Sequence, residues 1–274
     1  MDQRSPRQFS QRTHIVPTTL DSEQVGALFD YLAADRVYII DNEQPVGFDE
    51  EIRHLPLLGV AEVIRNRTQA DIEWAKTNFY QLREALTDVF EIIYREKSLG
   101  NDVIVNLSGG TKPVAIALVF GCSLANAGQP FYIPKKYSVS EDGKPEPLGP
   151  YDELFAANLV DPLNIEGLIP SEENKRRLLI GLLHSEGQLG VKDILVSVGL
   201  VSRNPPEDES EKESRMREIQ RHHRYASHLV EDGLFQKQDS TYQLTEMGEL
   251  VAKLVEIMDR VDEEVEKETR NTAV

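Results

Sequence analysis

The stretch Asn106-Leu107-Ser108-Gly109-Gly110-Thr111-Lys112-Pro113 separates two apolar runs and decides the fold of the first half of the chain. The run 103–105 before it is typical of a buried strand in a parallel sheet, and the run 114–120 after it of a buried helix. Because Gly109 and Gly110 permit a sharp turn, the order strand, glycine turn, helix predicts a loop at the carboxyl end of a strand.

The same loop carries groups that bind phosphate. Ser108 or Thr111 can cap the helix, and Pro113 suits the first turn, where its missing N–H costs no hydrogen bond. Free backbone N–H groups at the helix start, with Lys112 beside them, form an anion site. The alternative is a capped turn without a ligand, since Gly-Gly also serves plain strand-to-helix geometry. The polar cluster with one cation favours phosphate.

The loop is not a Walker A motif, whose pattern is G-x-x-x-x-G-K-[ST]. Here Thr111 precedes Lys112 and Pro113 follows it, and the earlier glycine of the motif is missing. The hydrolysis of nucleotides by a P-loop mechanism is therefore not expected.

Bulk composition indicates a cytoplasmic protein of two domains. The chain has 274 residues, 40% of them hydrophobic, and a single cysteine, Cys122, inside an apolar run. No run is long enough to cross a membrane and no signal peptide is evident, so no membrane partner is expected. One cysteine forms neither an internal disulfide nor a cysteine metal site, and we predict no metal and no cofactor.

The formal net charge of −17 argues against non-specific nucleic-acid binding by the molecule as a whole. Two interpretations remain open. Either the protein is built for a high-salt cytoplasm, in which screening weakens self-repulsion, or it is an ordinary acidic protein. In the first case its contacts with DNA must tolerate strong salt.

Residues 13–150 read as a parallel α/β domain of the Rossmann-like class, after a frayed tail over 1–12. The pattern predicts strands near 14–16, 36–40, 60–64, 103–105 and 130–133, with helices near 22–32, 70–98 and 112–127. Ligands of such sheets lie outside the carboxyl ends of the strands. The polar residues expected there are Thr18, Thr19, Asn42, Asn66, Asn106, Ser108, Gly109, Gly110, Thr111, Lys112 and Lys135.

Beyond a proline- and glycine-rich linker over 151–170, the pattern changes to short helices. Three helices, a hairpin near 235–244 and a closing helix predict a winged helix-turn-helix over 171–261. The remaining charged tail, 262–274, is expected to be frayed.

The third of these helices has a basic face. A helical projection places Met216, Ile219, His223, Ala226 and Val230 on one side and Arg217, Arg221, Arg224 and His228 on the other, with His222 and Tyr225 flanking the basic face. Cations facing phosphates and base edges over an apolar back are what a DNA-reading helix requires. The alternative is a solvated basic face. We expect contacts with DNA from Arg217, Arg221, His222, Arg224 and Tyr225.

The run Asn106 to Lys112 after a strand resembles the signature of the CARF domain, the CRISPR-associated Rossmann-like fold. The early strand followed by Thr18 and Thr19 resembles the first ligand-contacting loop of that family. With the winged helix-turn-helix, the chain resembles archaeal CARF–HTH transcriptional regulators, in particular a haloarchaeal branch.

The resemblance implies a homodimer whose two CARF domains form one pocket for a cyclic oligoadenylate. Ser108 to Lys112, with Thr18 and Thr19, would contact its ribose phosphates. The implied function is a ligand-responsive DNA-binding regulator linked to CRISPR-Cas, with no catalytic residues. One alternative is a metal-independent ring nuclease, in which Lys112 stabilises the transition state and Thr18 or Ser108 orients the ribose. A mononucleotide- or dinucleotide-binding protein is disfavoured, because Gly-x-Gly-x-x-Gly is missing after the first strand.

Overall fold

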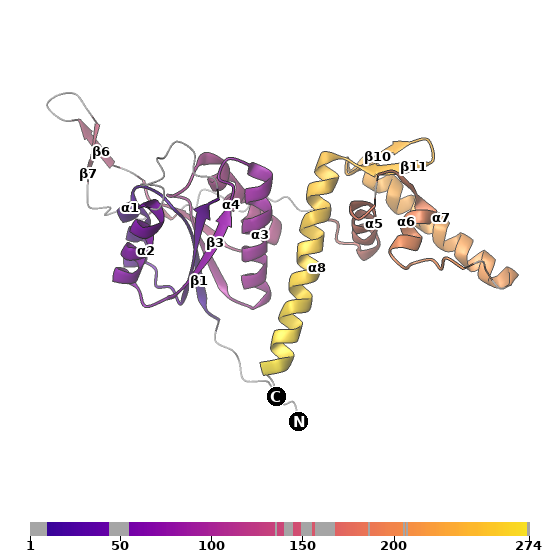
Figure 1. The fold of residues 1–274 in the computed structure, drawn as a ribbon, viewed down its shortest axis with the longest axis horizontal. Helices are drawn as coiled ribbons and strands as arrows, with labels where there is room; N and C mark the ends of the chain where they lie inside the picture. The colour runs from indigo at the N-terminus through magenta and orange to yellow at the C-terminus, as the bar shows by residue number, and fades with distance from the viewer. Residues whose placement is uncertain are drawn as a thin grey trace. The chain divides into compact units, whose positions relative to one another are not determined.

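The computed structural model describes residues 10–43, 55–134, 136–139, 145–148, 155–156, 168–185, 187–204, 206 and 208–272 (Figure 1). The chain divides into two compact units. Unit 1 comprises Met1–Ile165 and Val261–Val274, and unit 2 comprises Glu166–Arg260. Lys135, most of the expected N-terminal tail and most of the expected linker lie outside the described residues.

Unit 1 is built on a sheet of order β3-β2-β1-β4-β5-β8. Its first five strands in this order are parallel, and β8 pairs with β5 in the antiparallel sense. The strands are β1 (Arg12–Pro17), β2 (Arg36–Asn42), β3 (Asp71–Thr77), β4 (Asp102–Asn106), β5 (Gln129–Tyr132) and β8 (Phe155–Ala156). A separate hairpin joins β6 (Lys136–Val139) to β7 (Pro145–Leu148). The predicted Rossmann-like α/β class is confirmed.

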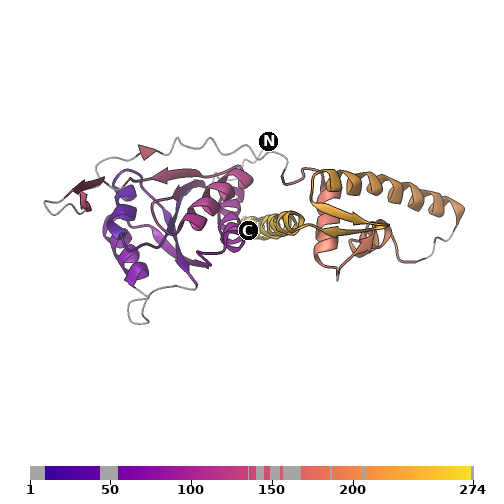
Figure 2. The same ribbon diagram turned by 90° about the horizontal axis from the view of Figure 1, so that it is seen from above.

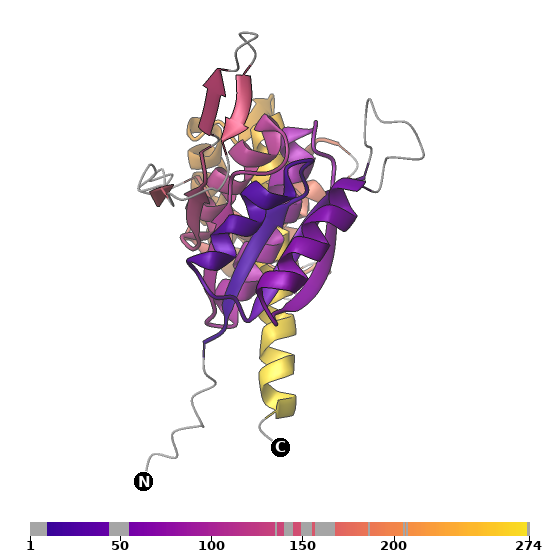
Figure 3. The same cartoon turned by 90° about the vertical axis from the view of Figure 1, so that its left-hand side faces the viewer.

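Helices cover both faces of this sheet (Figure 2). One face carries α1 (Ser22–Gly26), the short helix η1 (Ala27–Asp30) and α2 (Leu55–Arg67), which Figure 3 shows in front of the strands. The other face carries α3 (Leu82–Ser98) and α4 (Lys112–Ala125). The α2 face is closed by side chains alternating along the strands, such as Val37 and Ile39, against Val60 and Ile64 of α2.

Two sequence predictions for this unit are wrong. Residues 60–64 are helical rather than a strand, because Val60, Ala61 and Ile64 are buried together at a helical spacing. Residues 71–77 form the edge strand β3 rather than the start of a long helix. β3 has neighbours on one side only and leaves Trp74 51% exposed, so it lacks the alternation that identifies a half-buried strand.

A buried carboxylate holds α3 against the amino-terminal ends of β1 and β2. Glu96 accepts hydrogen bonds from Thr13 Oγ1 at 2.7 Å, Tyr38 OH at 2.9 Å, Asn101 Nδ2 at 2.7 Å and Arg36 Nη1 at 2.8 Å. Burial acts to raise the pKa of Glu96, but these hydrogen bonds and the charge of Arg36 hold it below its ordinary value. The carboxylate is therefore charged and fully partnered at neutral pH.

Unit 2 contains α5 (Glu173–Leu183), β9 (Leu189–Gly190), α6 (Val191–Ser197), α7 (Glu209–Glu231), β10 (Phe235–Gln238) and β11 (Thr241–Leu244). Its small sheet has the order β10-β11-β9. The core packs Leu178, Ile194, Leu229 and Phe235 together. The three helices and the hairpin occur in the order expected from the sequence, with a short strand, β9, that was not expected and that pairs with β11.

The closing helix α8 (Glu246–Thr272) extends through residues expected to be frayed. Its first part belongs to unit 2, where Val251 and Val255 join the core, and its last part to unit 1. Glu264 and Glu268 both pair with Arg95 of α3, the former at 2.6 Å, and Tyr94 OH donates to Asp262 at 3.1 Å. These contacts order the segment that composition alone marks as a charged tail.

His14 makes the stability of unit 1 depend on pH. Its ring is fully buried and stacks on Phe29, and burial lowers its pKa from 6.5 to about 4. The folded protein keeps this ring neutral while the unfolded chain takes up a proton below pH 6.5. We therefore expect the contribution of the neutral His14 ring to the free energy of unfolding to be complete above pH 6.5. Below pH 6.5 the free energy of unfolding should fall by about 1.4 kcal/mol per pH unit, down to about pH 4.

Urea unfolding of the wild type and of His14→Phe across this pH window measures the effect. The wild type should lose stability relative to His14→Phe as the pH falls, by about 1.4 kcal/mol of unfolding free energy per pH unit. A difference that stays constant between pH 6.5 and 5 would contradict the assignment.

Candidate functional site

The loop after β4 and the loop after β1 lie against each other at the carboxyl edge of the sheet. A Cβ placed on Gly109 would lie 2.3 Å from the carbonyl oxygen of Pro17, so only glycine permits this approach. Gly110 has a φ of +73°, and its N–H donates to the carbonyl oxygen of Thr18 at 3.0 Å. The two glycines thus join the two loops that the sequence assigned to one site.

Asn106 and Ser108 hold this loop in shape. Asn106 is fully buried; its Oδ1 accepts the N–H of Ser108 at 2.8 Å and its Nδ2 donates to the Val25 carbonyl at 3.2 Å. Ser108 Oγ accepts the N–H of Ile133 at 2.7 Å. The Asn106 side chain is occupied within the protein, so its contribution to a ligand is indirect. The Ser108 hydroxyl only accepts in these contacts, so its hydrogen can still be donated to a ligand.

Thr111 occupies the N-cap position of α4 without capping it. Its hydroxyl donates to the Phe79 carbonyl, and no side chain accepts from the first turn of the helix. The first backbone bond into the helix runs from Ala115 N to Thr111 O at 3.0 Å. Among the described residues, no acceptor faces the N–H groups of Gly109, Thr111 and Lys112. This is the geometry of an anion-binding helix terminus.

Lys112 adds the positive charge to this terminus. Its side chain is exposed, and it forms no ion pair with the residues that the structure describes. Ser108, Gly109, Gly110, Thr111 and Lys112 therefore lie together as predicted, with backbone groups and one cation available to a ligand.

The two threonines after β1 differ in their surroundings. Thr18 is buried, and its hydroxyl donates to Asp41 Oδ1 at 3.1 Å. Thr19 is partly buried, and its hydroxyl accepts the N–H of Asp21 at 3.3 Å. Thr18 thus reaches the end of β2 as well as the glycine loop, a connection that the sequence did not reveal.

The weaker expectations at the sheet edge have mixed outcomes. Asn42 ends β2, and its Oδ1 accepts the N–H of Phe79 at 3.1 Å. Asn66 does not end a strand; it lies in the last turn of α2, because the segment before it is helical. Asp41 and Gln24 also lie at this edge and were not among the expected residues. The position of Asp41, directly after the apolar residues of β2, could have identified it from the sequence. Gln24 is buried and donates to the Ile133 carbonyl.

Exposed apolar side chains occur in the segments around this edge. They belong to the loop after β1, the loop after β3, the starts of α3 and α4, and the end of β5. The residues are Leu20, Tyr80, Leu82, Ile116 and Tyr132.

The basic face of α7 is present in unit 2. The side chains of Arg217 and Arg221 are 78% and 62% exposed and pair with Glu213 at 3.3 Å and Glu218 at 3.1 Å. Arg224 is exposed and has no ion pair with a described residue. Counting partners within the described residues, the basic face therefore carries one arginine without an ion pair and two whose charge is partly offset.

The structure corrects the projection of this helix by one residue. The buried stripe is His222, Ala226 and Leu229, whereas His223 and Met216 are exposed. His222 Nδ1 lies 2.9 Å from the Glu218 carbonyl, and its ring meets that of the partly buried Tyr225 edge-on. The sequence has two neighbouring histidines, His222 and His223, and two neighbouring apolar residues, Leu229 and Val230. Either member of each pair could therefore be assigned to the buried face, and the helical projection chose the wrong one. His222 is consequently unable to reach DNA.

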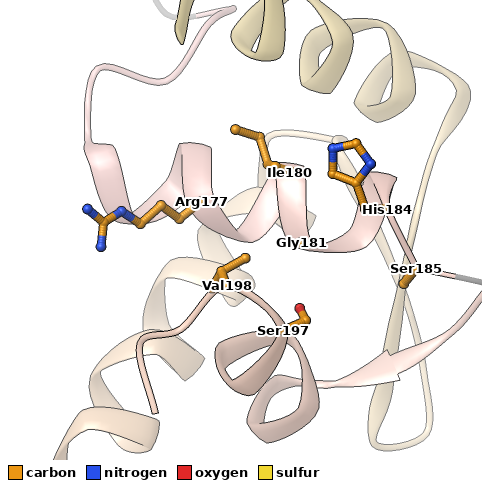
Figure 4. A pocket seen from close by; sticks show the side chains of 7 residues that line it. All are labelled: Arg177, Ile180, Gly181, His184, Ser185, Ser197 and Val198. Atoms are coloured by element: carbon orange, nitrogen blue, oxygen red, sulfur yellow. The ribbon is translucent and has the colours of Figure 1, made fainter. Parts of the chain in front are cut away.

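A shallow pocket of about 340 Å³ lies between α5 and α6 (Figure 4). Its polar side chains are already partnered: Arg177 by Glu173, His184 by Glu256 at 2.9 Å, Ser185 by the Leu182 carbonyl and Ser197 by the Ile194 carbonyl. Since its remaining lining is Ile180, Gly181 and Val198, we assign this pocket to packing between the two helices.

The described part of the chain has neither a metal-binding cluster nor a membrane-spanning helix. It holds no group of three or more His, Cys, Asp or Glu side chains arranged to bind a metal ion. None of its helices is both long and apolar enough to cross a bilayer. Cys122 is buried, which raises the pKa of its thiol to about 12.

Comparisons with known proteins find distant similarities. A family model described as HFX_2341_N:-like, N-terminal, matches residues 12–137, under half of the chain. No curated protein matches.

Three solved structures are similar at 12% identity. Can2 from Sulfobacillus thermosulfidooxidans in complex with cyclic tetra-adenylate has a TM-score of 0.35, with 94% of this chain and 65% of that chain covered. Enterococcus italicus Csm6 bound to cyclic hexa-2′-fluoro-hexa-dAMP has a TM-score of 0.36, with 81% of this chain and 58% of that chain covered. VC1899 from Vibrio cholerae has a TM-score of 0.36, with 90% of this chain and 66% of that chain covered. The chain thus spans less than two thirds of the length of each structure.

Gly109→Ala tests the contact between the two loops. The new methyl group would overlap the Pro17 carbonyl, and we expect the free energy of unfolding to fall by about 1–3 kcal/mol. Gly59→Ala in α2 is the matched control, because its nearest neighbour would be Ser22 Oγ at 3.5 Å, an ordinary contact. Equal stability of Gly109→Ala and the wild type in chemical denaturation would show that the loops are not in contact.

Proposed function

We propose that the protein is a ligand-responsive DNA-binding regulator that senses a cyclic oligoadenylate at a homodimer interface in a CRISPR-Cas context. The observation that carries the proposal is the uncapped start of α4, where backbone N–H groups and Lys112 converge without an acceptor in the described structure. The class of ligand comes from the resemblance of the Asn106 to Lys112 run to the CARF signature.

The backbone geometry favours phosphate as the group bound. Glycine at 109 and 110 lets this loop pack closely on the loop after β1. The dipole of the 14-residue helix α4 adds to the charge of Lys112. Asn106, Ser108 and Thr111 would keep the loop in this conformation. The roles expected for Asn106 and Thr111 are therefore to position the loop, and the phosphate contacts fall to the main chain, Lys112 and the Ser108 hydroxyl, whose hydrogen is not used by its bond to Ile133.

A homodimer would account for the exposed apolar side chains at the same edge. Leu20, Leu82 and Ile116 are each more than 40% exposed, and covering apolar area is the main favourable term in association. A two-fold axis at this edge would place two copies of the anion site on one ring, which itself carries repeated phosphates. Dimerisation and ligand binding would then use the same edge of the sheet.

The basic face of α7 supports the DNA-binding half of the proposal. Arg217, Arg221 and Arg224 point a local positive charge outward from a strongly acidic chain, over a helix whose back is buried. Tyr225 adds a phenol beside them, and His222 is excluded because it is buried. Arg217 and Arg221 would exchange their carboxylate partners for phosphates on binding.

Removal of the lysine tests the ligand. We expect Lys112→Ala to weaken the binding of cyclic tetra- or hexa-adenylate by about a hundredfold or more, because each ring loses one charge-assisted hydrogen bond at each of the two sites of the dimer. Calorimetry gives the affinity and the stoichiometry, which should be one ring per dimer. Lys267→Ala, an exposed lysine on α8 that pairs with Glu263, is the control.

Failure of the wild type to bind either ring would contradict the sensing role. Analysis of the ring after long incubation also tests the ring nuclease alternative. In that alternative, shorter products form with the wild type and not with Lys112→Ala. His14 is too deeply buried to supply a proton there.

Substitutions in α7 test the contact with DNA. We expect Arg217→Ala, Arg221→Ala and Arg224→Ala each to lower the affinity for a mixed-sequence duplex and to reduce the salt dependence of binding by about one phosphate contact per protomer. Arg224→Ala should have the largest effect, because Arg224 has no carboxylate partner among the described residues.

Fluorescence anisotropy over a series of salt concentrations measures both quantities. Arg177→Ala in α5 removes an arginine with a similar intrahelical partner from another helix and should leave binding unchanged. Equal salt dependence in all four variants and the wild type would remove α7 from the interface.

A further inference from the structure

Asp41 lies at the carboxyl end of β2, and one of its two carboxylate oxygens can accept a hydrogen bond from a ligand. Its Oδ1 accepts the Thr18 hydroxyl at 3.1 Å, and Oδ2 has no partner among the described residues. The residue is partly buried, and the only described cation near it in strand register is Lys76, its Cα partner on β3, with which it forms no ion pair. An acceptor is therefore held at the sheet edge in a fixed position.

The order of the sheet places this carboxylate beside the candidate anion site. β1 lies between β2 and β4, so Asp41 and the glycine loop flank the end of β1 from its two sides. Thr18 connects them: its hydroxyl bonds Asp41, and its carbonyl accepts the N–H of Gly110 at 3.0 Å. The carboxylate and the glycine loop before α4 are thus connected through a single residue, Thr18, which directly follows β1.

The chemistry of the two positions is complementary. A carboxylate repels phosphate and accepts a hydrogen bond from a hydroxyl group, whereas the α4 terminus with Lys112 attracts phosphate. In dinucleotide-binding sheets of this strand order, a carboxylate after the second strand accepts the ribose 2′-hydroxyl. This chain lacks the glycine fingerprint of those proteins after its first strand, so only the position of the carboxylate is comparable. Asp41 follows Thr18 at a similar distance along the chain.

From this arrangement we infer that Asp41 accepts a hydrogen bond from a ribose 2′-hydroxyl of the bound ligand and selects ribonucleotides over deoxyribonucleotides. The inference rests on the proposed function, since it assigns a partner to a second group of the same ligand. It also changes the role of Thr18: a hydroxyl that donates to Asp41 has no hydrogen left for a phosphate, so Thr18 positions the carboxylate.

The test compares two rings on the full-length protein. Calorimetry of the wild type should show that cyclic tetra-adenylate binds about tenfold or more tightly than its 2′-deoxy counterpart, the effect of one lost hydrogen bond to a charged group. In Asp41→Ala this ratio should fall to about one. Asp102→Ala, which removes an exposed carboxylate at the opposite end of β4, should keep the wild-type ratio.

Because the affinities for the ribo and deoxy rings are compared on the same variant, a general loss of affinity caused by the release of Thr18 in Asp41→Ala cancels from their ratio. Asp41→Asn keeps an oxygen acceptor for Thr18 and tests whether the charge is required; an intermediate ratio is expected. If the wild type binds ribo and deoxy rings equally, or if the ratio survives in Asp41→Ala, the inference about Asp41 is overturned while the sensing role stands. If the wild type binds neither cyclic tetra-adenylate nor cyclic hexa-adenylate, both are overturned.

Discussion

The approach of Gly109 to the carbonyl oxygen of Pro17 is the constraint on which the candidate site depends. No side chain fits between these two loops, because a Cβ at this position would lie 2.3 Å from that oxygen. The contact fixes the start of α4 beside the end of β1, and Gly110 completes it with a hydrogen bond to Thr18. Everything offered to a ligand at this edge is arranged around that approach.

The polar side chains of the loop stabilise its conformation, which leaves the backbone to face the ligand. Asn106 accepts the Ser108 N–H, and Ser108 accepts the N–H of Ile133, the residue after β5. Thr111 donates to the Phe79 carbonyl instead of capping its own helix. Since a capped helix would have its first N–H groups satisfied, the diversion of Thr111 is what leaves α4 open to an anion. A buried and fully partnered Glu96 secures the opposite end of the sheet.

Response to a ligand requires that the ligand bind two states of the protein with different affinity. Under the proposed function, the element common to both units is α8, a single helix that contributes Val251 and Val255 to the core of unit 2 and Glu264 and Glu268 to the ion pairs of α3 in unit 1. Within unit 1, α3 packs alongside α4, whose terminus carries the candidate anion site.

The sequence by itself determined the βα unit around Gly109 and Gly110, the Rossmann-like class and the basic face of α7, because each is a local pattern of apolar spacing, turn residues and charge. It misplaced segments 60–64 and 71–77, since an edge strand is only half covered and a short buried helix has the composition of a strand. The burial of His222 rather than His223, the ordering of 262–272 on α3 and the pairing of Thr18 with Asp41 were decided by tertiary structure alone. Each depends on which distant surface the residue meets, and that information is absent from the local sequence.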